Sequence, residues 1–232
     1  AMSSGDLAAR SSIWTKDEFG QLAQTFNTMA DELQYNTELL ESKVRHRTTE
    51  LQEANEKLAE AVDDLERLAR TDQLTGLMNR RALDESLAFE LRRSIRTNSP
   101  LGLLLLDLDH FKQVNDCYGH PTGDRVLADF AMLLRSRLRG IDILGRLGGE
   151  EFAVLLLDTN LDSALSVAQS LGEAVRSYPF MDVEGEPIDS VTVSSGIAIF
   201  PNDANDTETL VARADAALYE AKRTGRDKVV AW

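Results

Sequence analysis

The sequence has little cysteine, an excess of acids over bases, and no long apolar run. Cys117 is its single cysteine, so an internal disulfide is excluded and a reducing compartment is indicated. Lysine and arginine total 25 against 39 acids, a net charge of −14. A broad nucleic-acid surface is therefore not expected, although a local basic pocket for a phosphorylated ligand stays open. No stretch reaches the ~18 apolar residues needed to span a bilayer, and no signal peptide is expected.

Two common kinds of site are also missing from the sequence. Only three histidines occur, His46, His110 and His120, and none pairs with a cysteine at zinc-ligand spacing. The phosphate-binding pattern GxxxxGK[ST] does not occur either, which excludes a P-loop enzyme.

Residues 1–70 are polar, without proline, and predict a long helix. From Phe19 to Leu33 apolar residues recur at steps of three and four, which marks one face of a helix. A seam of apolar residues seven apart then indicates a coiled coil: Val44, Leu51, Leu58 and Leu65. The change of heptad phase after Leu40 predicts a stutter. The alternative, a single helix packed on its own domain, is less favoured because the opposite face is too polar to bury.

Residues 71–232 have the texture of a globular domain. The apolar run 101–107 is typical of a central strand, 146–157 predicts a hairpin, and 191–200 alternates like a strand. Helical spacing marks 123–139, 161–178 and 208–225, and 228–232 is expected to be an edge strand. We therefore expect an α+β, palm-like domain with a central, mostly antiparallel sheet flanked by helices.

Acidic residues follow two of the predicted strands. If the run 101–107 neighbours the hairpin, Asp107 and Asp109 face Glu150 and Glu151, since adjacent strands lie ~4.8 Å apart. Converging carboxylates of this kind favour a hard cation such as Mg²⁺, which also takes phosphate oxygens. The alternative is a solvated Glu-Glu pair on an exposed turn.

Basic groups that could hold a triphosphate occur at three places. Lys112 follows the acidic strand end, and backbone N–H groups near Phe111 begin a predicted helix. Lys222 and Arg226 are four residues apart near the last helix end, and we expect them to share one face.

Four motifs together resemble the GGDEF domain of diguanylate cyclases, over residues 71–232. They are TDQLTGLMNRR, DLDHFKQVNDCYGHPTGDRVL, RLGGEEF and ALYEAKRTGRDKV. The resemblance implies a homodimeric enzyme that joins two GTP molecules into cyclic di-GMP and releases two pyrophosphates. Residues 1–35 resemble the connector and second helix of a HAMP domain, and 36–70 a signalling coiled coil. A membrane segment is therefore expected upstream, with the parent protein at the cytoplasmic face of the inner membrane and this fragment soluble.

The resemblance also implies roles for individual residues. Asp107, Glu151 and the carbonyl of Leu108 would bind Mg²⁺, with Mn²⁺ as a substitute. Glu150, the third catalytic acid, would deprotonate the ribose 3′-hydroxyl or contact a second metal. Guanine would be read by Asn115 and Asp124. The triphosphate would be held by Phe111, Lys112, Lys222 and Arg226.

A second site is implied by Arg139 and Asp142, which precede the hairpin as the family's RxxD pair does. This pair would bind cyclic di-GMP as an inhibitor. Ser170 stands where a second arginine would be sought, so locking between domains is not expected to be complete.

Three other classes of protein remain to be weighed. A catalytically silent GGDEF module that only binds nucleotide is disfavoured by the intact acids. A coiled-coil adaptor does not explain the four motifs, and a template-dependent polymerase palm conflicts with the negative charge. Production of pyrophosphate from GTP distinguishes the first of these from an enzyme.

Overall fold

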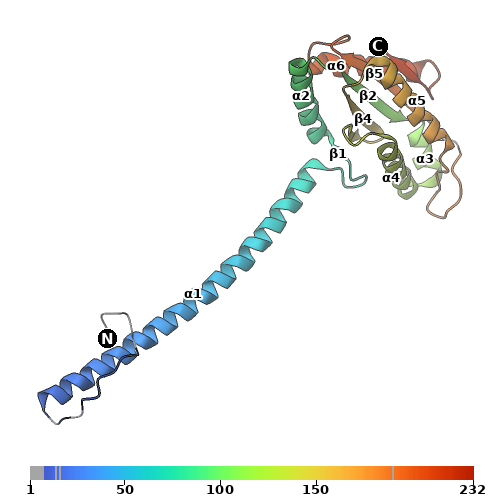
Figure 1. Ribbon diagram of the computed structural model, residues 1–232. Helices are drawn as coiled ribbons and strands as arrows, with labels where there is room; N and C mark the ends of the chain where they lie inside the picture. Colours follow the sequence, from blue (N-terminus) through green and yellow to red (C-terminus); the bar gives the residue numbers. More distant parts are fainter. Residues whose placement is uncertain (1–7, 14, 16, 190) are drawn as a thin grey trace. The chain divides into compact units, whose positions relative to one another are not determined.

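The computed structural model describes residues 8–13, 15, 17–189 and 191–232, with the backbone only for residues 63–67 (Figure 1). The chain divides into two compact units, 1–65 and 66–232. Among the described residues, no helix is both long enough and apolar enough to cross a membrane.

The first unit is dominated by one continuous helix, α1 (Glu18–Arg70), which runs on into the second unit. Asp17 caps its start by accepting a hydrogen bond from the backbone N–H of Gly20 at 3.3 Å. The described seam residues lie on its surface, where Val44 is 63%, Leu51 64% and Leu58 63% exposed, and the side chain of Leu65 lies outside the described part. The helix thus leaves its apolar stripe without a covering layer in the described part of a single chain.

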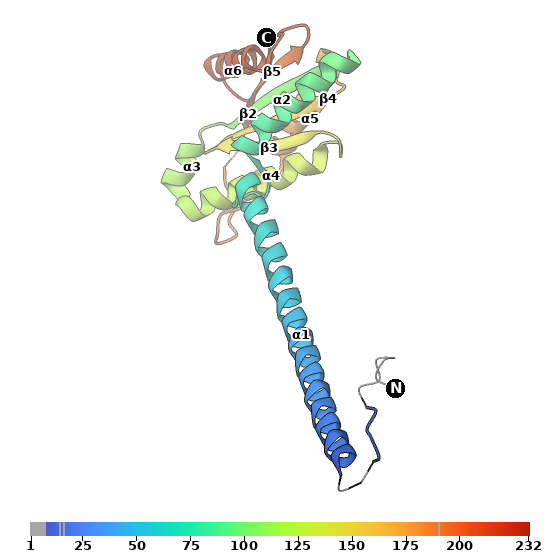
Figure 2. The same cartoon turned by 90° about the vertical axis from the view of Figure 1, so that its left-hand side faces the viewer.

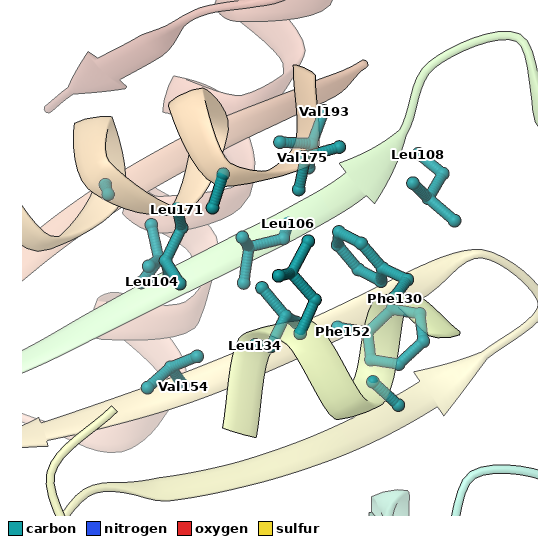
Figure 3. Close-up of a cluster of buried hydrophobic side chains, with 14 of the residues drawn as sticks. Leu104, Leu106, Leu108, Phe130, Leu134, Phe152, Val154, Leu171, Val175 and Val193 are labelled. Carbon is teal, nitrogen blue, oxygen red and sulfur yellow. The ribbon is translucent and has the colours of Figure 1, made fainter. Parts of the chain in front are cut away.

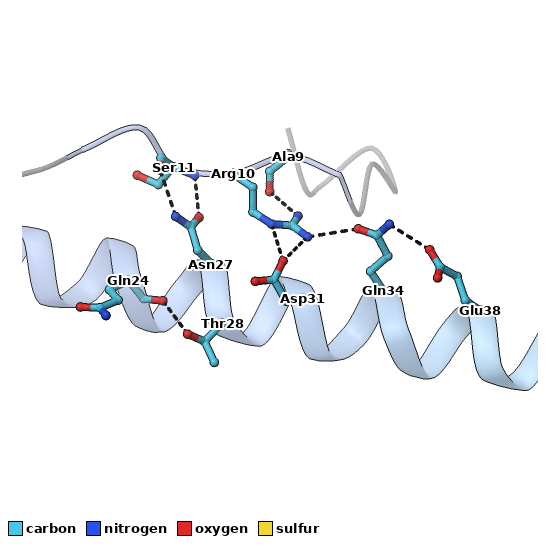
Figure 4. Close-up of polar contacts among 9 residues, drawn as sticks. All are labelled: Ala9, Arg10, Ser11, Gln24, Asn27, Thr28, Asp31, Gln34 and Glu38. Atoms are coloured by element: carbon cyan, nitrogen blue, oxygen red, sulfur yellow. Dashed lines mark hydrogen bonds and ion pairs between the residues drawn. The ribbon is translucent and has the colours of Figure 1, made fainter.

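The segment 8–13 runs back along the start of α1 (Figure 4). Ser11 and Asn27 exchange two hydrogen bonds, of 2.8 and 3.0 Å, between backbone and side-chain amide. Arg10 reaches one turn further along the helix, where its Nε lies 2.9 Å from Asp31 Oδ1 and its Nη2 3.1 Å from Gln34. Polar pairing therefore fixes this segment antiparallel to the helix.

The described residues of the second unit form a six-stranded sheet in the order β1-β3-β4-β2-β5-β6 (Figures 1 and 2). The central strands β3, β4, β2 and β5 are antiparallel neighbours, while β1 and β6 pair in parallel at the two edges. This confirms the predicted mostly antiparallel centre. The strands are β1 (Met78–Asn79), β2 (Leu101–Leu108), β3 (Ile143–Gly148), β4 (Glu151–Leu157), β5 (Val193–Phe200) and β6 (Val229–Ala231).

Two apolar cores cover the two faces of the sheet. Because side chains alternate along a strand, Leu104 and Leu106 enter one core and Leu103 and Leu105 the other. The first core packs against α4 and α5, and Phe130 of α4 meets Phe152 edge-to-face at 4.8 Å (Figure 3). Each fully buried leucine contributes roughly 2 kcal/mol of transfer free energy. The second core lies under α2 and α6.

The helices of this unit are α2 (Arg80–Thr97), α3 (Phe111–Tyr118), α4 (His120–Arg137), α5 (Leu161–Ser177) and α6 (Thr207–Arg223). Neither α2 nor the short strand β1 was expected from the sequence. The last helix ends at Arg223 and is followed by Gly225 with φ +116°, which agrees with a helix closed by that glycine, and Arg226, with φ +60°, lies beyond it. The prediction that Lys222 and Arg226 share a helical face is therefore wrong.

Candidate active site

The acidic residues meet at one end of the central strands. Asp107, at the end of β2, lies opposite Glu151, the first residue of β4. Glu150 occupies the turn before β4, and its carbonyl accepts a hydrogen bond from the Leu108 N–H at 3.3 Å. Asp107 is 7% exposed, whereas Glu151 is exposed and Glu150 half-buried. The expectation that the two strand ends are neighbours is confirmed.

One lysine compensates this negative charge. Lys222 of α6 places its Nζ 2.6 Å from Asp107 Oδ2. Burial raises the pKa of the Asp107 carboxyl group, and the charges of Glu150 and Glu151 raise it further against the opposing effect of Lys222. Three carboxylates against one ammonium group leave room for further positive charge, which favours a bound cation.

The ligand set fits a metal that is shared with a nucleotide. Among the described residues, no group of three or more histidine, cysteine or acidic side chains lies close enough to bind a metal alone. Mg²⁺ in phosphate-transfer sites commonly takes one or two carboxylates and completes its shell with phosphate oxygens and water. Asp107 and Glu151 are the side chains available here, and the chain's own residues thus provide part of such a shell.

Asp109 does not join this cluster, which corrects the expectation of four converging acids. Its two carboxylate oxygens accept hydrogen bonds from Thr192 Oγ1 at 2.8 Å, Ser194 Oγ at 2.7 Å and the Asp227 N–H at 3.0 Å. The side chain is buried and its acceptors are already used, so its role is to hold neighbouring segments together.

Arg146 stabilises the turn that carries Glu150. It was not among the predicted site residues. Its guanidinium donates to the Gly149 carbonyl at 2.9 and 2.7 Å, and to Asp72 at 3.0 Å. Gly149 has φ +53°, a left-handed conformation that a glycine adopts without cost. Asp72, which belongs to the motif TDQLTGLMNRR, therefore contacts the residue that fixes this turn.

The pKa of Asp72 is held below its ordinary value. Burial acts in the opposite direction as the largest single effect, but hydrogen bonds from Thr75 and the hydrogen bond and charge of Arg146 together outweigh it. The ionised carboxylate is consequently the form that the fold stabilises.

The predicted guanine-reading residues lie on two adjoining helices, Asn115 on α3 and Asp124 in the first turns of α4. The helices approach closely at Gly123, where an added Cβ would lie 2.0 Å from Asn115 Oδ1. Glycine at 123 therefore allows the Asn115 amide to lie against α4 beside Asp124. Asn115 is half-buried and Asp124 exposed, an arrangement open to a ligand.

The predicted phosphate-binding residues fall into three settings. Phe111 is buried in the first core at the start of α3, so only its backbone is available there. Lys112 and Arg226 are exposed, and neither side chain forms a hydrogen bond or ion pair within the described residues. Lys222 forms an ion pair with Asp107. If it also contacted a phosphate, its charge would be shared between that group and the carboxylate.

Arg139 and Asp142 form a closed pair in this structure. The guanidinium binds the carboxylate through two parallel contacts of 3.0 and 2.7 Å, and Nη2 also donates to the Leu157 carbonyl and Thr159. Ser170 lines a hollow of about 330 Å³ together with Arg137, so an arginine does lie beside that position, on α4.

A separate cavity of about 420 Å³ lies between α2 and α6 over the second core. Of the predicted site residues only Glu151 lines it, while Asn115 and Asp124 lie elsewhere. It is therefore separate from the predicted guanine-reading residues.

Two protein-family models match parts of this chain. The family model described as "Diguanylate cyclase, GGDEF domain" matches residues 69–228, and the HAMP domain model matches residues 1–35. The response regulator PleD of Caulobacter vibrioides is 42% identical over 163 residues, which are 70% of this chain and 36% of PleD. The diguanylate cyclase DgcP of Pseudomonas aeruginosa is 47% identical over 169 residues, 72% of this chain and 25% of DgcP.

Solved structures show the same fold. The coiled coil and GGDEF domain of DgcB from Caulobacter crescentus, in complex with c-di-GMP, superposes with a TM-score of 0.75 at 32% identity, covering 83% of this chain and 99% of that one. The active GGEEF domain of a diguanylate cyclase from Vibrio cholerae gives a TM-score of 0.62 at 32% identity, covering 67% and 97%.

The chain therefore belongs to the diguanylate cyclase GGDEF-domain family, with a HAMP match at its start. It spans only 36% and 25% of the lengths of PleD and DgcP.

Proposed function

We propose that the chain is a diguanylate cyclase, which condenses two GTP molecules into cyclic di-GMP and releases two pyrophosphates. The observation that carries the proposal is the pairing of Asp107 with Glu151 at the end of the central strands, in a GGDEF-family domain. Lys222 already lies at this cluster and adds positive charge where a triphosphate needs it.

Recognition of GTP is assigned to the two adjoining helices. The Asp124 carboxylate can accept hydrogen bonds from guanine N1–H and the exocyclic amine, a donor pair that adenine lacks at those positions. Asn115, held against α4 by the close approach at Gly123, supplies an amide next to that carboxylate. Lys112 and Arg226 offer unpaired charges for the phosphates, together with the backbone N–H groups at Phe111 and Lys112.

The metal is assigned to Asp107, Glu151 and the Leu108 carbonyl. When bound, Mg²⁺, or Mn²⁺ in its place, would neutralise the triphosphate and polarise the α-phosphate. Glu150 is assigned the proton of the attacking ribose 3′-hydroxyl, because it is half-buried, directly precedes Glu151 and lies near enough to Asp107 for its charge to raise the pKa of that carboxyl group.

Each domain holds one GTP, so the reaction needs two domains facing each other. The exposed seam of α1 supports a homodimer, because pairing two such helices would bury Leu51, Leu58 and their neighbours. Dimerisation raises the effective concentration of the second half-site. We assign residues 1–35 to the HAMP part, 36–70 to the signalling coiled coil and 71–232 to the catalytic domain, in a membrane-anchored parent whose catalytic part faces the cytoplasm.

Regulation by product is assigned to Arg139 and Asp142. To bind cyclic di-GMP, the Arg139 fork would exchange its present contacts with Asp142 and Thr159 for the ligand. Motions of the HAMP part would be transmitted along the coiled coil through the heptad phase shift after Leu40. They would change how the two GGDEF domains of the dimer face each other.

The test is turnover of GTP with Mg²⁺, measured as pyrophosphate and cyclic di-GMP over a range of protein concentrations. We expect product from the wild-type chain and a rate per protomer that rises with concentration until dimers saturate. Binding of GTP without formation of pyrophosphate would instead identify a catalytically silent, nucleotide-binding module.

A further inference from the structure

The loop that follows α6, residues 224–228, has an unusual backbone. Three consecutive residues have positive φ, namely Gly225 at 116°, Arg226 at 60° and Asp227 at 45°. For residues other than glycine this region costs about 1–2 kcal/mol each and persists only where surrounding contacts hold it. Something in the fold therefore keeps this loop, and with it Arg226, in place.

A buried carboxylate provides the first of these contacts. The Asp227 N–H donates to Asp109 Oδ2 at 3.0 Å, while Thr192 and Ser194 donate to the same carboxylate. Asp109 is only 6% exposed and lies two residues after Asp107. One side chain thus connects the strand end that carries a proposed metal ligand to the loop that carries Arg226.

An ion pair provides the second contact. Arg176, in the last turn of α5, places Nη1 2.6 Å from Asp227 Oδ1, although 51 residues separate them in sequence. Arg176 belongs to none of the four motifs. The Arg226 side chain, by contrast, is exposed and makes no such contact in the part of the chain that the structure describes. The fold therefore fixes the loop backbone and leaves the Arg226 guanidinium available.

We propose that Asp109 and the Arg176–Asp227 ion pair are positioning residues for the substrate. They hold the 224–228 loop so that Arg226 faces the triphosphate from the same side as Lys222. Neither touches GTP, and both act through Arg226. The identity of the substrate rests on the proposed function, whereas the contacts that hold the loop do not.

Affinity for GTP, measured by calorimetry with Mg²⁺ on the full chain, tests this proposal. Arg176→Ala should weaken GTP binding about two- to fivefold, the range expected from a partly exposed ion pair. Asp109→Asn, which loses an acceptor at a buried position, should weaken it about tenfold. Arg223→Ala is the matched control, because it breaks an exposed pair with Glu220 on α6 without touching the loop. Its affinity should equal that of the wild type.

A double variant separates positioning from a general structural effect. In an Arg226→Ala background, Arg176→Ala should cause no further loss of affinity, because the residue through which it acts is gone. An equal loss in both backgrounds would overturn the proposal. Should Arg176→Ala fail to fold by circular dichroism, Asp227→Asn tests the same pair, since asparagine tolerates the left-handed conformation and keeps the N–H bonded to Asp109.

The outcomes distinguish this proposal from the proposed function. If cyclic di-GMP forms and both ion-pair variants bind GTP like the wild type, the positioning role is wrong and the function stands. If GTP binds more weakly to Arg176→Ala but no cyclic di-GMP forms from the wild type, the function is wrong and the positioning role stands. Absence of GTP binding by the wild-type chain overturns both.

Discussion

The two units of the molecule bury their apolar side chains in different ways. The unit 66–232 alternates leucines between two faces of a sheet and covers both with its own helices. In the unit 1–65, α1 carries leucines such as Leu51 and Leu58 more than half exposed. The first pattern is complete within one chain, whereas the apolar stripe of α1 stays exposed among the described residues, and under the proposed function a second chain covers it. On that proposal, chemistry and assembly are encoded in separate stretches of the sequence, and turnover depends on both.

The largest expected effect removes chemistry and leaves assembly intact. Asp107→Asn should reduce cyclic di-GMP formation by about a thousandfold or more, because a charged metal ligand is lost. The melting temperature should stay equal or rise, since burial and neighbouring carboxylates disfavour the ionised form of this side chain. Product formation, thermal unfolding and sedimentation are the measurements. A variant that retains wild-type turnover would remove the basis of the proposed site.

The next effect breaks assembly and leaves the catalytic fold intact. Leu58→Glu puts a charge in the seam of α1 and should convert dimers to monomers, lowering turnover about a hundredfold at micromolar protein. Gln52→Glu adds the same charge outside the seam and should change neither dimerisation nor turnover. Light scattering and turnover, measured on the same samples, check this. A monomeric variant with full activity would contradict the division of roles.

A smaller effect concerns product binding within the second unit. Arg139→Ala should weaken cyclic di-GMP binding about tenfold or more, because a charged bidentate contact is lost. The variant should therefore keep forming cyclic di-GMP after the product has accumulated, when the wild type slows. Arg135→Ala, a nearby exposed arginine on α4, serves as the control. Titration with cyclic di-GMP measures the affinity of both variants. If Arg139→Ala binds cyclic di-GMP as tightly as the wild type does, the assigned inhibitory site is wrong.

The smallest effect concerns the start of the second unit. Asp72→Asn should lower the free energy of unfolding by about 1 kcal/mol at pH 7, because Arg146 loses its carboxylate. Since the folded pKa of Asp72 is lowered, this stabilisation is present above about pH 4 and is lost as the pH falls through the folded value. The gap between the variant and the wild type should therefore close on acidification.

Urea unfolding at several pH values measures this gap. Asp84→Asn, an exposed acid on α2, is the control and should change stability little at any pH. A difference that stays constant down to the lowest pH would show that the Asp72 charge is not responsible.

The sequence was sufficient for features that repeat locally or occur in motifs. The strand 101–107, the hairpin 146–157 and the opposition of Asp107 to Glu151 follow from a continuous apolar run, turn residues and strand pairing. Helix α2 was not predicted, although Leu83, Leu87 and Leu91 recur every four residues along it and are buried.

Contacts between distant segments could not be predicted in this way. Asp109 looked like a fourth acid of the cluster, but Thr192, Ser194 and Asp227 reach it across more than 80 residues. Arg146 and Asp72 are likewise 74 residues apart. No spacing rule connects such pairs, since their geometry depends on how whole strands and helices pack.

Gly123 has a consequence for how nucleotide preference can change. An extra carbon atom there would collide with Asn115 Oδ1 at 2.0 Å and displace the amide. A mutation at a position assigned no contact with the base could thus blur discrimination between purines although Asn115 and Asp124 were both retained. Judging from sequence whether a related domain is selective therefore requires reading this small residue along with the two residues proposed to contact the base.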